Sequence, residues 1–106
     1  SDYGSATTVS PPQPKVTVGK GSTCGERSCN TGNGSCSSAS CRWIKVTTSN
    51  FNGGVTCHFT KNGNNVSGWT NLGMGGNTTA ESNNFLGEPG AVVRATCDGV
   101  TDALTW

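Results

Sequence analysis

The chain has 106 residues, a formal net charge of +1 and only 12% charged residues. This length fits one domain, and the near-neutral charge without a basic run argues against nucleic-acid binding. Leu, Ile, Val and Phe together number 16, so the hydrophobic core is sparse, and the six cysteines are the expected second source of stability.

The first segment, residues 1–15, is rich in Ser, Thr and Pro and shows no hydrophobic periodicity. Such a composition is typical of a semi-extended linker. We therefore expect the folded domain to span residues 16–106. The sequence has no apolar run of membrane-spanning length, so we expect any export signal or membrane anchor to lie outside this chain.

A cysteine-rich insert follows at residues 24–41, with Cys24, Cys29, Cys36 and Cys41 arranged as two Cys-x4-Cys pairs. Local pairing within each pair requires tight turns, because bridged Cα atoms lie about 4.4–6.8 Å apart and five extended steps span roughly 17 Å. Nested pairing, Cys24 with Cys41 and Cys29 with Cys36, fits a hairpin around an Asn-Gly turn. Both schemes remain open on these grounds. A four-cysteine zinc site is the less favoured alternative, because the weakly charged composition is typical of exported proteins, where cysteines form disulfides.

Seven short segments have the character of β-strands and are separated by turn residues. They cover residues 16–18, 42–48, 55–60, 66–72, 77–82, 91–97 and 103–106. The third and sixth alternate with period two, which places Cys57 and Cys97 on the apolar side of their strands. These patterns predict an all-β, immunoglobulin-like antiparallel β-sandwich, with a Cys57–Cys97 disulfide clamping two strands through the core.

Several short motifs carry a family resemblance. They are the run from Cys36 through Cys41-Arg-Trp to Val-Thr-Cys57, the motif Gly87-x-Pro-Gly-Ala-x-Val93, and the ending Asp98-Gly-Val followed by a strand that finishes in Trp106. Together they resemble a small extracellular domain of actinobacterial envelope proteins, found after the linker of some membrane-anchored serine/threonine protein kinases. The resemblance covers about residues 36–106. It implies a sensing, binding or spacing ectodomain without catalytic residues, and it implies local pairing of Cys36 with Cys41.

The sequence offers no catalytic constellation. Its one histidine, His58, follows Cys57 directly, and neighbours in a strand point to opposite faces, so the two cannot form a thiolate–imidazolium pair. The carboxylates are scattered through expected turns and edges, and Asp98 is explained by its Asp-Gly turn. We therefore expect no enzymatic activity, no metal and no cofactor.

A carbohydrate or cell-wall ligand is the sharpest binding hypothesis. Sugar sites on β-sandwiches combine exposed aromatic rings with amide side chains, and Trp69 lies in a polar segment with Asn71 close by. Trp43 is expected on the strand face opposite Ile44 and Val46. The predicted contact residues are therefore Trp69, Asn71 and Trp43. The alternative is that these rings cover a sparse core.

The sequence thus predicts a monomeric, non-catalytic binding or sensing domain in an oxidising extracellular compartment, with a cell-wall glycan or a surface protein as ligand. Two alternatives remain. One is a spacer domain without a ligand. The other is a secreted inhibitor that presents the disulfide-framed loop of residues 24–41.

Overall fold

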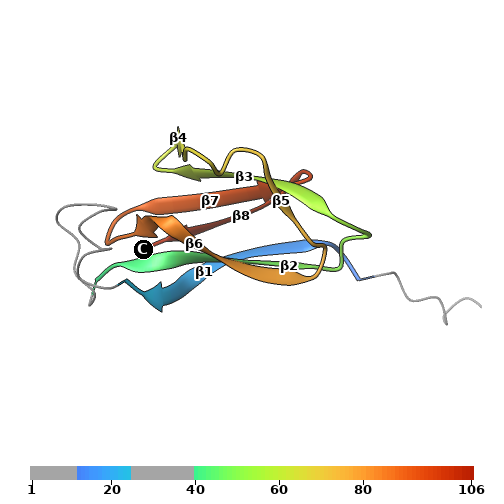
Figure 1. Ribbon diagram of the computed structural model, residues 1–106, viewed down its shortest axis with the longest axis horizontal. Helices are drawn as coiled ribbons and strands as arrows, with labels where there is room; N and C mark the ends of the chain where they lie inside the picture. The colour runs from blue at the N-terminus through green and yellow to red at the C-terminus, as the bar shows by residue number, and fades with distance from the viewer. Residues whose placement is uncertain (1–11, 25–39) are drawn as a thin grey trace, which may run out of the picture.

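The computed structural model describes residues 12–24 and 40–106, which form eight β-strands and no helix (Figure 1). Within these residues no helix is therefore long and apolar enough to cross a membrane. The strands are β1 (Lys15–Thr23), β2 (Arg42–Ser49), β3 (Val55–Lys61), β4 (Asn64–Asn65), β5 (Leu72–Met74), β6 (Thr78–Gly87), β7 (Val92–Cys97) and β8 (Val100–Thr105).

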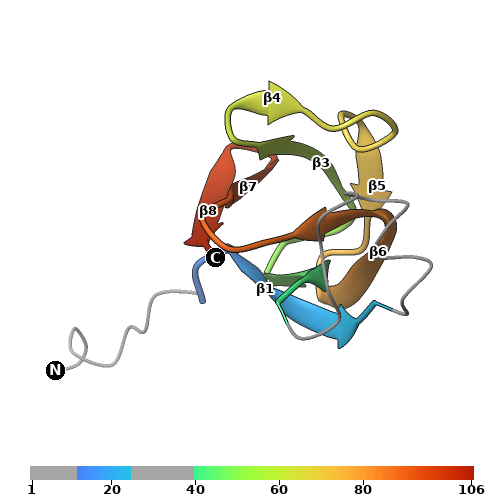
Figure 2. The same cartoon turned by 90° about the vertical axis from the view of Figure 1, so that its left-hand side faces the viewer.

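The strands form two antiparallel sheets that pack face to face around one core (Figure 2). One sheet has the order β1-β2-β6, and the other has the order β4-β3-β7-β8, with β5 also paired to β3. At one margin β1 lies beside β8, and the carboxylate of Asp102 accepts a hydrogen bond from the Val18 backbone N–H at 2.7 Å. The predicted all-β, two-sheet architecture is confirmed, and the immunoglobulin-like assignment stays a prediction.

The period-two patterns of the sequence define the core. In β3, Val55, Cys57 and Phe59 are buried, while Thr56 and His58 between them are exposed. Opposite them, Ile44 and Val46 of β2 are almost fully buried. Each sheet thus offers one apolar face, and the two faces bury one another as expected for half-buried strands.

The Cys57–Cys97 disulfide forms, but it does not join the two sheets. Cys57 lies directly opposite Cys97 in the β3–β7 ladder, with the two Cα atoms 4.1 Å apart. The predicted disulfide between these two strands is confirmed, and both sulfur atoms lie on the buried side, as the period-two pattern predicted. The bond ties β3 to β7 within the five-stranded sheet.

Several predicted elements have different boundaries: β1 covers Lys15–Thr23 instead of residues 16–18, and β8 covers Val100–Thr105 instead of residues 103–106. The segment 66–72 is not a strand: turns connect β4 to β5, and only Leu72 belongs to a ladder. The strand expected at 77–82 continues to Gly87, so Phe85 and Leu86 also lie in β6. Polar residues at 82–84 hide this continuation, because they interrupt the apolar alternation.

That interruption is a bulge in β6. Trp43 pairs with Leu86 and Lys45 pairs with Glu81, so Ile44 of β2 faces an enlarged segment of β6. The Ser82 hydroxyl fills the gap in the ladder: it accepts the Ile44 N–H at 3.0 Å and donates to the Phe85 carbonyl at 2.6 Å. Ser82 is 3% exposed. A buried polar group needs such partners, which accounts for a serine inside this strand.

A second, smaller cluster lies at the end of the molecule where β1 ends and β2 begins. Cys24, Cys41 and Leu86 are buried there, and Trp43 packs against them. Cys24 and Cys41 are both disulfide-bonded. Cys29 and Cys36 lie outside the described residues. The prediction of local or nested pairing, which involves both of them, therefore also lies outside the described part of the chain.

Trp106 follows β8 and lies against the core, partly buried. Its backbone N–H donates to the Ala91 carbonyl at 2.8 Å, and its carbonyl accepts from Gly90 at 3.1 Å. The indole ring contacts the backbone of Gly87 so closely that a Cβ there would collide with it. The ring thus covers one end of the space between the sheets.

Candidate functional site

The expected ligand contact at Trp69 is part of the core. Its side chain is 9% exposed, and its ring packs edge-on against Phe59 and Phe85 with centroids 5.2 Å apart in both cases. The prediction of an exposed ring is therefore wrong. Trp69 turns inward because its backbone follows β3: the Phe59 N–H donates to the Trp69 carbonyl at 2.8 Å.

The other two predicted contact residues are not gathered into one site. Asn71 is exposed, in the turn that precedes β5. Trp43 is half-buried on the outer face of the three-stranded sheet, where it packs on the second cluster, formed by Cys24, Cys41 and Leu86. Trp43 lies on the strand face opposite to that of Ile44 and Val46, as predicted, but its ring packs against the second cluster. The residues Trp69, Asn71 and Trp43 therefore do not form one aromatic binding surface.

The structure instead assembles a polar surface on the outer face of the five-stranded sheet. We call it the polar face and define it by His58, Thr60, Arg94, Thr96 and Thr101. His58 lies opposite Thr96, which lies opposite Thr101, and Thr60 lies opposite Arg94. The hydroxyls of Thr96 and Thr101 are hydrogen-bonded at 2.8 Å. Three strands thus present a continuous array of hydrogen-bonding groups.

One margin of the polar face is ordered by a pair of side chains. The His58 Nε2 lies 2.8 Å from the Asn65 Oδ1, which brings β4 into the array. An amide oxygen only accepts hydrogen bonds, so the imidazole Nε2 carries the proton. In the neutral ring this leaves Nδ1 as an acceptor, while the Asn65 amide nitrogen keeps its donors. Donors and acceptors therefore stand side by side at this margin.

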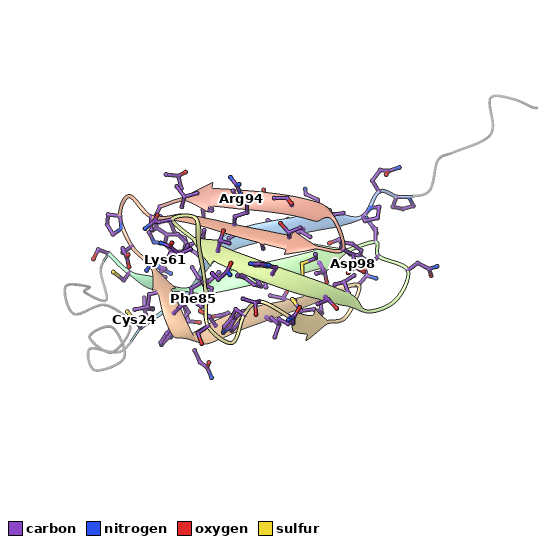
Figure 3. The ribbon with its side chains drawn as sticks, turned by 90° about the horizontal axis from the view of Figure 1, so that it is seen from above. Cys24, Lys61, Phe85, Arg94 and Asp98 are labelled. Carbon is purple, nitrogen blue, oxygen red and sulfur yellow. A yellow bond between two sulfur atoms is a disulfide. The ribbon has the colours of Figure 1, made fainter. Side chains whose placement is uncertain are left out.

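Arg94 supplies a fixed positive charge to the polar face. It is exposed on β7 and, along the length of the sheet, lies between the labelled Lys61 and Asp98 in Figure 3. Its direct cross-strand neighbours are Thr60 and Ala103. Neither can neutralise it, and no ion pair within residues 12–24 and 40–106 involves Arg94.

Other basic side chains are placed differently. Lys61 forms an ion pair with Glu88 at 2.8 Å, and Lys45 lies opposite Glu81 on the other sheet. Lys20 lies over the Trp106 ring, 5.3 Å from its centroid. Each has an electrostatic partner of a kind common on protein surfaces. Lys15 of β1 is also exposed, and no ion pair among the described residues involves it, so Arg94 is distinguished by its place among the hydroxyl groups of the polar face.

On the outer face of the three-stranded sheet, a carboxylate side chain of β6 is hydrogen-bonded to β1. Glu81 of β6 reaches β1, where it accepts hydrogen bonds from the Ser22 backbone N–H at 2.8 Å and the Ser22 hydroxyl at 3.2 Å. These bonds, chiefly the one from the backbone and aided by nearby Lys45, lower the pKa of Glu81, although some desolvation opposes them. A Cβ at Gly21 would collide with this carboxylate, so a glycine lets it pass.

The lowered pKa makes a prediction about acid stability. A carboxylate whose pKa is lower in the folded state stabilises the fold above its unfolded pKa, and the contribution disappears as the pH falls through the folded value. The unfolded chain binds more protons in that window, so stability falls on acidification. Urea unfolding between about pH 6 and pH 3 should show a smaller acid loss in Glu81→Gln than in the wild type. Parallel curves for the two proteins would contradict the prediction.

No group of three or more His, Cys, Asp and Glu side chains that could hold a metal occurs in the part of the chain that the structure describes. Comparison with protein-family models, curated proteins and solved structures finds no match for this chain. The polar face is therefore the candidate site on the strength of its own geometry. In the sequence, the polar face corresponds to the outward-facing positions of the period-two pattern in residues 55–60 and 91–97.

Proposed function

We propose that this chain is a non-catalytic extracellular binding domain whose ligand contacts the polar face. The observation that carries the proposal is the side-by-side arrangement of hydroxyl, imidazole, amide and guanidinium groups on adjacent strands. Two of these strands, β3 and β7, are tied together by the Cys57–Cys97 disulfide. The groups therefore sit on a rigid base, which limits the entropy lost when a ligand binds.

The chemistry of the polar face favours a glycan as ligand. Sugar hydroxyls both donate and accept hydrogen bonds, and the face offers both functions within a few ångströms: the Thr96–Thr101 hydroxyl pair and the His58–Asn65 pair. Bonds of this kind are individually weak in water, so several are needed together. A cell-wall glycan, which repeats along its length, can engage several domains at once and gain avidity.

The setting of the domain supports an oxidising compartment. The Cys57–Cys97 bond is buried, and none of the described cysteines is free; disulfides of this kind persist mainly outside the cytosol. Together with the resemblance of residues 36–106 to actinobacterial envelope domains, this supports an ectodomain of a membrane-anchored protein such as a serine/threonine kinase. The domain would then serve as its ligand-sensing part.

An amide NMR titration tests the proposal. Soluble peptidoglycan fragments and neutral glucans are added to the 15N-labelled chain up to about 10 mM, a range that detects weak affinities. We expect saturable shifts in β3, β7 and β8, centred on Thr60 and Thr96, and weaker binding by the isosteric Thr96→Val variant. Thr79→Val, on the outer face of the other sheet, is the matched control. Absence of shifts with every glycan would overturn glycan binding and favour the spacer function.

A further inference from the structure

The polar face carries a charge pattern that a neutral sugar would not use. Its one permanent charge is Arg94, whose cross-strand neighbours are a hydroxyl and a methyl group. Directly opposed charges on a sheet normally stabilise one another, and here that partner is missing among the described residues. A ligand that covered Arg94 without a negative charge would strip water from the guanidinium and return nothing equivalent.

The carboxylates nearest this sheet are already engaged elsewhere. Asp98 accepts a hydrogen bond from the Thr56 backbone N–H at 3.1 Å, and Asp102 accepts one from the Val18 N–H at the margin with β1. Glu88 is held by Lys61. None of the three is a cross-strand neighbour of Arg94 in its ladders. The guanidinium is therefore available to a group supplied by the ligand.

We propose that the polar face selects glycans that bear a carboxylate, with Arg94 binding the carboxylate and the His58–Asn65 and Thr96–Thr101 pairs binding neighbouring sugar hydroxyls. This proposal rests on the glycan-binding function above. A guanidinium presents a planar fork that matches the two oxygens of a carboxylate, and such bidentate contacts are both strong and directional. One positive charge also matches one carboxylate, and Arg94 is the only arginine or lysine among the residues that define the face.

The strand register places the two ends of the proposed site on adjacent strands. His58 and Arg94 are diagonal neighbours, since His58 pairs with Thr96 and Arg94 lies two positions earlier on β7. Diagonal neighbours in an antiparallel pair are about 7–8 Å apart at the backbone, within reach of long side chains. A glycan that lies across β3 and β7 can therefore place a carboxylate at Arg94 while the His58 Nδ1 accepts a hydrogen bond from a hydroxyl of the same or an adjoining sugar.

The decisive test compares two probes that differ only in charge. An oligogalacturonate and its methyl ester are titrated into the complete 106-residue chain by amide NMR and calorimetry at low ionic strength. We expect the acid to bind at the polar face about tenfold more tightly than the ester, as for a charge-assisted contact, and added salt to reduce this preference. Equal affinity for acid and ester would overturn the inference.

Variants assign the preference to Arg94. Arg94→Gln should lower the affinity for the acid about tenfold and should not weaken binding of the ester, which no longer has to desolvate the guanidinium. Arg94→Lys should recover part of the loss because it keeps the charge without the fork. Lys15→Gln removes the same charge from the outer face of the other sheet and should change neither affinity. An unchanged acid affinity in Arg94→Gln would overturn the role of Arg94. If neutral glycans bind but the acid is not preferred, only this inference fails, whereas absence of any glycan binding removes the proposed function as well.

Discussion

Removing the Cys57–Cys97 disulfide by the paired substitutions Cys57→Ala and Cys97→Ala is expected to lower the free energy of unfolding by about 4 kcal/mol. The two cysteines are 40 residues apart in sequence, and in the chain-entropy model a cross-link of that span restricts the unfolded chain by about this amount. Small domains have a net stability of only about 5–15 kcal/mol. The variant should therefore be close to unfolding at ordinary temperatures.

Urea unfolding followed by circular dichroism measures this loss. The paired variant leaves Cys24 and Cys41 in place, so it measures the loss of the Cys57–Cys97 bond alone. Strong reductant would break this bond together with the other disulfides. A reduced wild type should be at least as unstable as the variant. A variant that unfolds within about 1 kcal/mol of the wild type would contradict the entropic account, and an unchanged spectrum in strong reductant would contradict it as well.

The turns show what could be predicted from local sequence. Asn62-Gly63, an Asn-Gly pair of the kind that favours hairpin turns, joins β3 to β4, and both residues have positive φ, 53° and 83°. Asp98-Gly99 repeats this conformation at 46° and 86°. A paired Asn-Gly or Asp-Gly turn needs no distant contact, because its residue types tolerate the left-handed region that the hairpin requires. The strand faces of β3 and β7 were predictable for the same reason.

The errors share a physical cause, which is dependence on partners distant in sequence. Ser82 interrupts an apolar pattern, and only the position of Ile44 in the neighbouring strand shows why a hydroxyl is needed there. The polar face has the same origin, since Arg94 and His58 come together through strand register. Sequence periodicity identified their outward direction but not their juxtaposition.

Trp69→Ala is expected to lower the free energy of unfolding by about 3–5 kcal/mol, the range for removing a buried aromatic ring. The ring is 9% exposed and contacts both Phe59 and Phe85, so its loss leaves a cavity lined by two aromatic rings. Thermal and urea unfolding provide the measurement. Trp69→Phe should lose less, because it keeps one ring in the cluster. The exposed Asn71→Ala, two residues away, should stay within about 0.5 kcal/mol of the wild type.

The stability of Trp69→Ala must be measured before its affinity, because both unfolding and the loss of a ligand contact would lower the affinity. If Trp69 were a sugar contact, Trp69→Ala would lose affinity and keep the wild-type unfolding midpoint, and that outcome would contradict its place in the core. The structure leads to the opposite expectation, in which Trp69→Ala loses affinity only to the extent that it unfolds. Arg94→Gln should show the reverse pattern, because Arg94 is exposed and no ion pair among the described residues involves it. Comparing the two variants therefore separates a residue that supports the binding face from one that contacts the ligand.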